Sequence, residues 1–329
     1  MPGHSVERQS SLEGKGMKNL LCFRCLSGER MIAYNHYIKF IPELKNDKKV
    51  EGSFSNVVTV QESSNISLDE KLQYELTFFN NQGRDLILYT DREFVRTQKG
   101  QIWAFEVKSV VKFFWHSDTL GLEYIKYDNF TEELLEYWCL HIVLPIFFTI
   151  EETFDFLHAG AVEVDGKPIL FVAESFGGKS TMTDFFMKQG HTMLSDDKVA
   201  TYEKEGHFLV VPSHPHHRPH RGMEDLGFFI ENVSKDPKPI HAMYELEKAD
   251  ENSEVSIVEV KGTEKFKSLR YASEINLFFM KPKRFAYLMQ LAQVVPVYRV
   301  SVPWDLERLD EVYYKIVHHS KNLNPGNVL

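Results

Sequence analysis

The sequence predicts a mixed fold that is α/β in its C-terminal core and α+β overall, and three observations lead to this prediction. Short apolar runs separated by glycine-containing turns fill the first third of the chain, which is typical of a strand-rich domain. A long apolar helix pattern begins after Thr131. Residues 169–189 then have the order of strand, glycine-bearing loop and helix, which indicates a nucleotide-binding type of core.

The N-terminal part divides into a leader and a domain. Residues 1–16 are polar, rich in glycine and serine, and end before a second methionine, so we interpret them as a leader added for expression. Residues 17–130 are expected to form the smaller, strand-rich domain, an antiparallel sheet with loops at 63–69 and 82–84. The clearest strand patterns in this region are 82–90, 100–107 and 121–128.

Composition limits the classes of protein that this chain can belong to. Its 329 residues favour two domains, and 43% hydrophobic residues are ample for packed cores. The net charge of −9 argues against a nucleic-acid binder, because the phosphate backbone requires a basic face. Three cysteines cannot build a disulfide framework, so a reducing, cytoplasmic location is expected. Cys22 and Cys25 have redox or zinc spacing, but buried strand positions are the expectation because no second pair completes a site.

A long apolar segment marks the predicted domain boundary. Residues 134–150 are the most lipid-like stretch, but Glu136, His141 and Pro145 interrupt it. It therefore falls short of the ~20 apolar residues that span a bilayer. We expect a buried helix and no membrane association, with residues 131–329 forming the catalytic domain.

The most informative segment is 169–181, ILFVAESFGGKST, which resembles a Walker A phosphate-binding loop (P-loop). In such a loop the backbone amides face the phosphates, Lys179 neutralises the outer phosphate, and the Ser180 hydroxyl holds Mg²⁺. A helix over 179–189, closed by Gly190, would add its positive dipole end. ATP and Mg²⁺ are the expected cofactors. The predicted nucleotide-binding residues are Ala173, Glu174, Ser175, Phe176, Gly177, Gly178, Lys179, Ser180 and Thr181.

Two adjacent acids follow the next apolar run. Asp196 and Asp197 come directly after 192–194, so we expect them at a strand end beside the loop, where ligands bind in α/β sheets. One carboxylate could steady Mg²⁺ while the other takes a proton from an attacking hydroxyl. The plain alternative is a solvated turn that caps the following strand.

Together these motifs resemble the HPr kinase/phosphorylase superfamily, and especially its HPr-kinase-like branch, which includes the lasso-peptide serine kinases. The resemblance covers about Leu157 to Ile316 and rests on five motifs in order: LHAGAVEVDG, AESFGGKST, KQGHTMLSDD, PSHPHHR and VPVYRVSVPWDLERL. It implies a P-loop-containing, HPr-kinase/PEP-carboxykinase-like core. The bifunctional relatives assemble as hexamers, so a homo-oligomer stays open.

The resemblance also implies roles for single residues. Lys179 corresponds to the phosphate-binding lysine and Ser180 to the Mg²⁺-binding hydroxyl. Asp196 corresponds to the base that activates the acceptor hydroxyl, and Asp197 would lie near the metal. His158 matches a histidine before the P-loop strand and takes an active-site role, although without the resemblance a core histidine would be the simpler interpretation.

The chain departs from the family pattern at two loop positions, since Ala173 and Phe176 replace the first and second glycines. Further on, residues 213–222 hold four histidines and two arginines. This segment could bind a metal, form a surface loop, or contact phosphate. The family places an arginine near Arg218, and Arg221 followed by glycine resembles a second family feature; either could steady the transferring phosphoryl group.

The predicted function is an ATP-dependent kinase that transfers phosphate to a hydroxyl, that of a serine in a small protein or peptide. Two alternatives remain at this point. Ala173 and Phe176 are compatible with a nucleotide-binding regulatory protein of weak catalytic power, and the related core is compatible with a PEP-carboxykinase-like enzyme. The acceptor, any reverse phosphorylase activity and the oligomeric state are not encoded in a recognisable motif.

Overall fold

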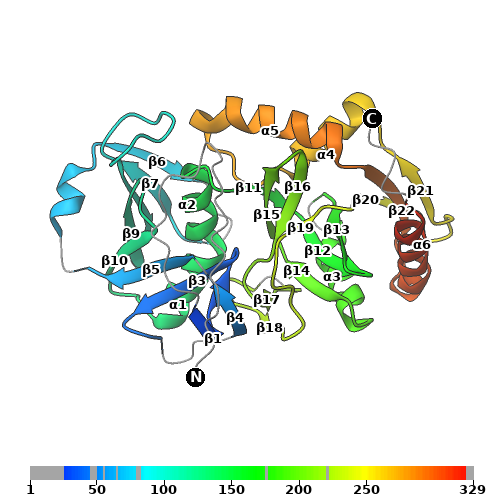
Figure 1. Ribbon diagram of the computed structural model, residues 1–329, viewed down its shortest axis with the longest axis horizontal. Helices are drawn as coiled ribbons and strands as arrows, with labels where there is room; N and C mark the ends of the chain where they lie inside the picture. The colour runs from blue at the N-terminus through cyan, green and yellow to red at the C-terminus, as the bar shows by residue number, and fades with distance from the viewer. Residues whose placement is uncertain are drawn as a thin grey trace, which may run out of the picture.

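The computed structural model describes residues 26–44, 50–54, 56–63, 66–78, 83–174, 177–219 and 222–323. The predicted leader and both cysteines of the Cys22–Cys25 pair lie outside these residues. The fold is a mixture of α and β structure, with several sheets and few helices, drawn out along one axis (Figure 1).

An eight-stranded sheet forms most of the N-terminal part. Its order is β2 (Ile32–Ala33), β3 (His36–Ile41), β5 (Val57–Glu62), β10 (Gly121–Lys126), β9 (Val111–His116), β8 (Ile102–Val107), β7 (Leu86–Thr90) and β6 (Tyr74–Phe78). The strands predicted over 82–90, 100–107 and 121–128 are confirmed as β7, β8 and β10. The expectation of an antiparallel sheet is wrong at one side, because β5 pairs in parallel with both β3 and β10.

Two smaller features complete this part. A separate antiparallel pair joins β1 (Leu26–Arg30) and β4 (Val50–Phe54). A 3₁₀ helix, η1 (Ile66–Lys71), occupies part of the segment in which a loop was expected.

A helical layer packs on the sheet: α1 (Glu132–Trp138), a π-helical turn η2 (Cys139–Val143) and α2 (Leu144–Ile150). Thr131 caps α1, because its hydroxyl accepts from the Leu134 N–H at 3.2 Å. Within the described ranges this is the one helix long and apolar enough to cross a membrane, but 83% of its most apolar window is buried. The prediction of a buried helix is therefore confirmed.

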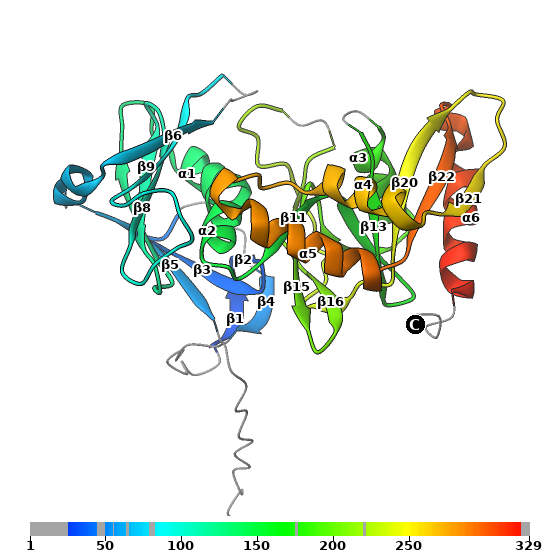
Figure 2. The same cartoon turned by 90° about the horizontal axis from the view of Figure 1, so that it is seen from above.

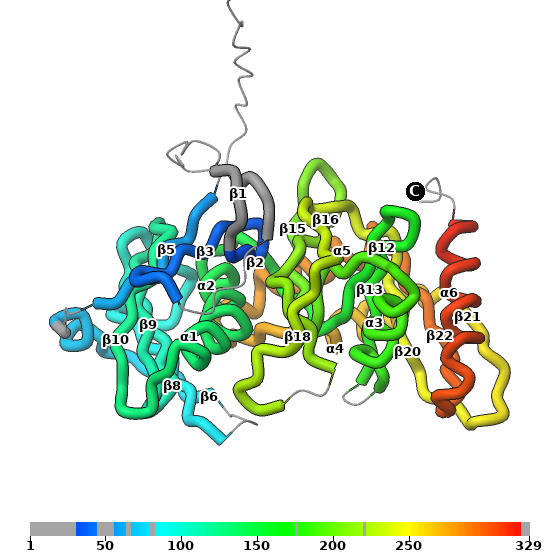
Figure 3. The backbone as a smooth tube through the Cα atoms, turned by 90° about the horizontal axis from the view of Figure 1, so that it is seen from below, coloured from blue at the N-terminus to red at the C-terminus, as the bar shows by residue number. Residues whose placement is uncertain are grey.

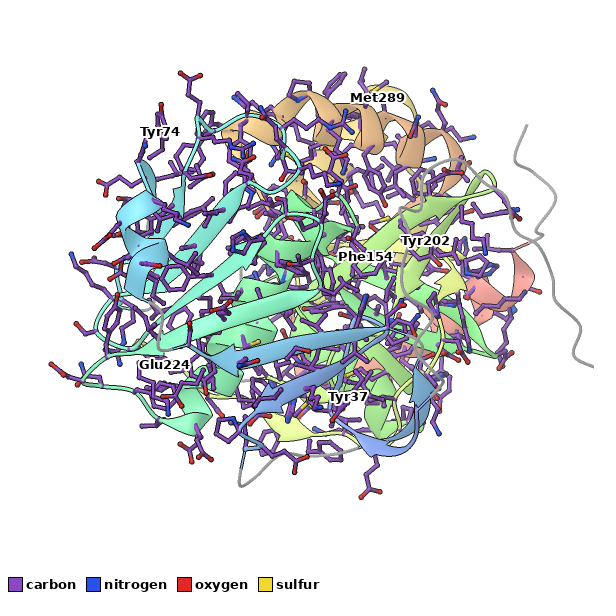
Figure 4. All side chains as sticks on the ribbon, turned by 60° about the vertical axis from the view of Figure 1, so that its left-hand side comes forward. Tyr37, Tyr74, Phe154, Tyr202, Glu224 and Met289 are labelled. Carbon is purple, nitrogen blue, oxygen red and sulfur yellow. The ribbon has the colours of Figure 1, made fainter. Side chains whose placement is uncertain are left out.

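The side chains of this helical layer share one hydrophobic core with the eight-stranded sheet. Trp138, Phe147 and Phe148 lie in the same cluster as Trp103 and Phe113. Figure 4 shows Phe154, just beyond α2, near Tyr202 of the next sheet, with ring centroids 5.9 Å apart. The domain boundary proposed at residue 131 stays a prediction.

The C-terminal part contains two further sheets and a short pair, β17 (His216–His217) with β18 (Phe228–Phe229). The four-stranded sheet has the order β11 (Asp155–His158), β15 (Lys198–Lys204), β16 (His207–Val211) and β19 (Lys238–Pro239). The six-stranded sheet has the order β14 (Thr192–Ser195), β12 (Gly160–Val164), β13 (Lys167–Val172), β20 (Ala242–Ala249), β22 (Val297–Pro303) and β21 (Ser256–Glu259).

Helices cover both faces of the six-stranded sheet (Figures 2 and 3). On one face, α3 (Lys179–Lys188) and α6 (Leu309–Asn322) pack on side chains such as Phe171. On the other, α4 (Gly262–Ala272) and α5 (Lys281–Val294) pack on the alternate side chains, such as Leu170. The remaining helical turns are η3 (Phe278–Met280) and η4 (Leu306–Arg308).

The strand directions of the six-stranded sheet position the candidate site. Strand β12 is antiparallel to both β13 and β14, and β20 is parallel to both β13 and β22. The carboxyl ends of β13, β14, β20 and β22 therefore all meet at one edge of the sheet, which we call the ligand edge. Open α/β sheets bind ligands at such an edge.

The chain changes sheets twice at this same place. It passes from β11 into β12 at Ala159, and from β14 into β15 at the pair Asp196 and Asp197. The Ala159 N–H donates to the Asp197 carbonyl at 3.3 Å, which joins the two crossings. The next residue, Gly160, has no space for a side chain, because a Cβ there would lie 1.9 Å from Thr183 Oγ1 of α3.

Candidate functional site

The glycine loop between β13 and α3 is a tight turn. The Gly177 N–H donates to the Glu174 carbonyl at 2.8 Å, and Gly178 has a φ of 89°, which favours glycine. A Cβ on Gly177 would lie 2.8 Å from Ala173 Cβ. The methyl group that Ala173 adds is thus accommodated opposite a residue without a side chain. Ser175 and Phe176 lie outside the described residues.

Lys179 begins α3, as predicted, and its side chain is buried against the loop. The side chain is 5% exposed, and its ammonium donates to the carbonyls of Ala173 at 2.8 Å and Glu174 at 3.4 Å. Neutral carbonyls are weaker partners for a buried cation than an anionic oxygen. A phosphate at the loop would therefore offer the ammonium a better partner. In the same helical turn Ser180 is half-buried and Thr181 is exposed.

Asp196 follows β14 at the ligand edge and is held from one side. It is 5% exposed, and its Oδ2 accepts from His217 Nδ1 and from the backbone N–H of Arg218, both at 2.9 Å. Within the described part of the chain, its Oδ1 has no hydrogen-bond partner. The carboxylate is therefore fixed through one oxygen, and the other oxygen is available to an incoming group.

His217 also connects this carboxylate with the helix of the phosphate loop. Its Nε2 lies 3.5 Å from Asp184 Oδ1 on α3, and the imidazole is 2% exposed. Asp184 in turn pairs with Lys188 one helical turn later, at 2.6 Å. The buried imidazole thus lies between two carboxylates: it is hydrogen-bonded to Asp196, while its Nε2 approaches Asp184 of α3 without forming a hydrogen bond among the described residues.

Asp197 has a left-handed backbone, with φ 70°, and faces His158. His158 Nδ1 lies 3.3 Å from Asp197 Oδ1 and 3.4 Å from Glu274 Oε2. The Glu274 carboxylate accepts from Lys198 Nζ at 2.5 Å. An isolated bridge between Leu157 and Ser273 brings this segment to β11. Asp197 is therefore part of a group of four ionisable side chains.

Lys198 supplies the positive charge of this group. Burial lowers the pKa of Lys198, but the carboxylates of Glu274 and Asp197 outweigh that effect and raise it above its usual value. The ammonium therefore stays charged next to the acid pair, and it compensates two of the carboxylates gathered there.

The histidine-rich segment is buried, so the interpretation as a surface loop is wrong. His214, His216 and His217 are each 2% exposed, and β17 holds the last two. No group of three or more histidine, cysteine, aspartate or glutamate side chains in the described ranges is arranged to hold a metal ion. His220 lies outside those ranges.

His141 and His214 pack against each other as neutral rings. Their centroids are 4.2 Å apart, and His141 belongs to the π-helical turn. Burial, with a further contribution from the Arg218 charge, lowers the pKa of His141 to about 3. Burial likewise lowers the pKa of His214 well below its ordinary value. These rings support the segment by packing and carry no charge at neutral pH.

Arg218 is directed toward the loop that follows it. Its guanidinium donates to the Gly222 carbonyl at 2.9 Å and lies 5.1 Å from the centroid of the Tyr137 ring. Its Nε has no hydrogen-bond partner among the residues that the structure describes. Arg221 lies outside them. The guanidinium thus has donor capacity that an anion could use.

The loop after Arg218 is fixed to the N-terminal part. Glu224, labelled in Figure 4, accepts from both Arg84 Nε at 2.9 Å and Arg84 Nη2 at 3.0 Å. It also accepts from the Trp138 indole N–H at 2.9 Å. A bidentate pair with a third donor gives this loop a defined position.

The structure thus brings most of the predicted residues to one edge, and it adds three that were missed. Asp196, Asp197, His158 and Arg218 surround the two sheet crossings, and Lys179 begins the helix to which His217 connects them. The missed residues are His217, Lys198 and Glu274. His217 lay in a segment already noted for its histidines, whereas no pattern indicated Glu274.

Comparisons with known proteins add little. No family model matches the chain, and no curated protein matches it. Among the solved structures that match, the HPr(Ser) kinase/phosphatase from Coxiella burnetii has a TM-score of 0.29 and 14% identity, over 50% of this chain and 97% of that one. This is at most a distant likeness to an HPr-kinase-like fold, and it carries no argument about activity.

Proposed function

We propose that the chain is an ATP-dependent kinase that transfers phosphate to a hydroxyl, that of a serine in a small protein or peptide. One observation carries the proposal. A buried lysine behind a glycine turn and a buried aspartate, one of whose carboxylate oxygens has no partner in the described part of the chain, lie at the same edge of one sheet. Phosphoryl transfer needs positioning and charge compensation more than covalent chemistry, and these residues supply both.

The loop and α3 would hold the nucleotide. Lys179 would exchange the loop carbonyls for the outer phosphate oxygens, and the amides at the start of α3 would face the same phosphates. Mg²⁺ fits the donor chemistry, because the Ser180 hydroxyl is half-buried in the first turn and Asp197 offers a carboxylate oxygen. The ion would supply charge compensation between the outer phosphates.

Asp196 would act as the base. As the acceptor oxygen bonds to the γ-phosphorus, the bond to the β–γ bridging oxygen breaks and the acceptor proton moves to Asp196 Oδ1. His217 and the Arg218 N–H keep Oδ2 in place during this step. Arg218, with Arg221, would steady charge on the phosphoryl group, and His158 would orient Asp197.

The test begins with nucleotide binding by the full chain. With Mg²⁺, ATP should raise the melting temperature of wild-type protein, and Lys179→Ala should lose this stabilisation. Lys188→Ala, at an exposed position of the same helix, should retain it. Equal stabilisation of wild type and Lys179→Ala would contradict the proposed phosphate site.

The second step tests catalysis. A labelled-phosphate screen against small proteins and peptides should show transfer by wild type, and Asp196→Asn should lower the rate by about 10²–10⁴-fold. Asp184→Asn, whose carboxylate lies 3.5 Å from the far nitrogen of His217, is the matched control and should have a much smaller effect. If Asp196→Asn transfers phosphate like wild type, Asp196 is not the base.

A nucleotide-binding regulatory protein is the second candidate, and one observation favours it. The Lys179 ammonium is already bonded to the loop carbonyls, which lowers the gain from binding phosphate. This candidate predicts stabilisation by ATP that depends on Lys179 but no phosphate transfer to any acceptor. A cytoplasmic location is part of the proposal for both candidates, and the oligomeric state stays open for both.

A further inference from the structure

Trp304 differs from every other tryptophan in the chain. Trp103, Trp115 and Trp138 are 0–1% exposed and lie in the core of the N-terminal part, whereas Trp304 is 41% exposed. These four are all the tryptophans in the sequence. An indole is a large apolar surface, so leaving it in water forfeits a substantial gain from burial.

The position of Trp304 relates it to the phosphate loop. It follows the carboxyl end of β22, at the ligand edge. Its backbone N–H donates to the Ala249 carbonyl at the end of β20, at 3.1 Å. Its Cζ3 atom lies 3.9 Å from the place that a Cβ on Gly178 would occupy. The indole edge therefore adjoins the last glycine before Lys179.

Lys248 holds the indole at this position. Its ammonium lies 4.4 Å from the ring centroid, which is within the range of a cation–π interaction. The ammonium can cover only one face of the ring, and the indole keeps 41% of its surface exposed. A flat ring can therefore still lie on it. Lys248 also adds a positive charge close to the loop where the polyphosphate would bind.

We propose that Trp304 is the platform on which the base of the bound nucleotide stacks, with Lys248 keeping the indole in place. The inference rests on the proposed function, because the phosphates must occupy the loop to bring the base to Trp304. Stacking on an aromatic side chain tolerates every base, so this site recognises a nucleoside triphosphate as a class and favours the larger purine rings.

The experiment separates the base from the phosphates. ATP and inorganic tripolyphosphate, each with Mg²⁺, are titrated into wild type, Trp304→Ala and Trp304→Phe, and binding is measured by calorimetry. Trp304→Ala should bind ATP about tenfold more weakly, Trp304→Phe should lose less, and the affinity for tripolyphosphate should be unchanged. Leu306→Ala, at a more exposed apolar position nearby, is the matched control and should bind both probes like wild type.

Intrinsic fluorescence supplies a second readout, because the other three tryptophans are buried in the core of the N-terminal part. ATP should change the emission of wild type, and Trp304→Phe should remove that change. If Trp304→Ala binds ATP as wild type does, or loses ATP and tripolyphosphate equally, the base does not stack on Trp304 even though the phosphate site stands. If wild type binds neither probe, the proposed function and this inference are both overturned.

Discussion

The phosphate loop and the aspartate turn lie at the same edge of one sheet, but they are built in opposite ways. In the described part of the loop, the Gly177 N–H and the Lys179 ammonium both donate to carbonyls of the loop itself. The turn at Asp196 and Asp197 is held by side chains that come from β11, β17 and the segment after α4. A phosphate site can thus be local, whereas a positioned base depends on residues from distant parts of the chain.

The largest expected effect concerns His217, which is distant in the sequence and is hydrogen-bonded to Asp196 in the turn. His217→Leu removes the donor to Asp196 Oδ2 and the connection to Asp184, so phosphate transfer should fall about 100-fold while KM for ATP changes little. His217→Asn should recover part of the rate, since its amide can donate to Asp196. Steady-state kinetics measure both quantities. A higher KM for ATP with an unchanged kcat would show that His217 supports the phosphate loop and not the turn at Asp196.

The next effect tests how closely α3, the helix after the phosphate loop, packs against β12 of the six-stranded sheet. Gly160→Ala places a methyl group against Thr183, so the free energy of unfolding should fall by about 1–3 kcal/mol. Thr183→Ala removes the closest atom, and the double variant should therefore be more stable than the sum of the two single changes predicts. Urea unfolding of the four proteins checks this. Strict additivity would mean that α3 moves freely relative to β12.

The last effect is of similar size for each residue and concerns two buried, neutral histidines, His141 and His36. Burial lowers the pKa of His141 to about 3 and that of His36 to about 4, although a hydrogen bond with the Tyr34 carbonyl partly opposes the shift at His36. Between these values and the ordinary pKa of 6.5, the unfolded chain binds more protons than the folded chain. Stability should therefore fall by about 2 kcal/mol for each histidine as the pH drops from 7 to 5.

Unfolding by urea at pH 5, 6 and 7 measures this pH dependence. His141→Leu should reduce its slope by about one proton. An unchanged slope for His141→Leu would mean that His141 is already protonated in the folded protein. The packing of the histidine segment behind Asp196 would then require a different explanation.

The two regions also explain what sequence could and could not predict. The strand before the loop and the start of α3 at Lys179 follow from local turn and helix signals, and they are confirmed. The parallel strand pairs of the first sheet were missed, because strand patterns do not encode which neighbour a strand chooses.

The candidate site divides in the same manner. Asp196 was predicted from its place after an apolar run, but its partner His217 is 21 residues away and Glu274 is 76 residues from Lys198. The sequence left three interpretations of the histidine segment open, and the burial of this segment against the π-helical turn is visible only in the folded chain. Such pairings depend on the folded chain and leave no spacing to detect.

The anchoring of Glu224 has a consequence for anyone who wishes to shorten this protein. A fragment that starts at residue 131 would lack Arg84, which binds the Glu224 carboxylate through two nitrogens. It would also uncover the apolar side of α1 and α2 that the eight-stranded sheet now covers. A shortened version for crystallisation or engineering should therefore keep the N-terminal sheet, because it holds the loop beyond Arg218 in position.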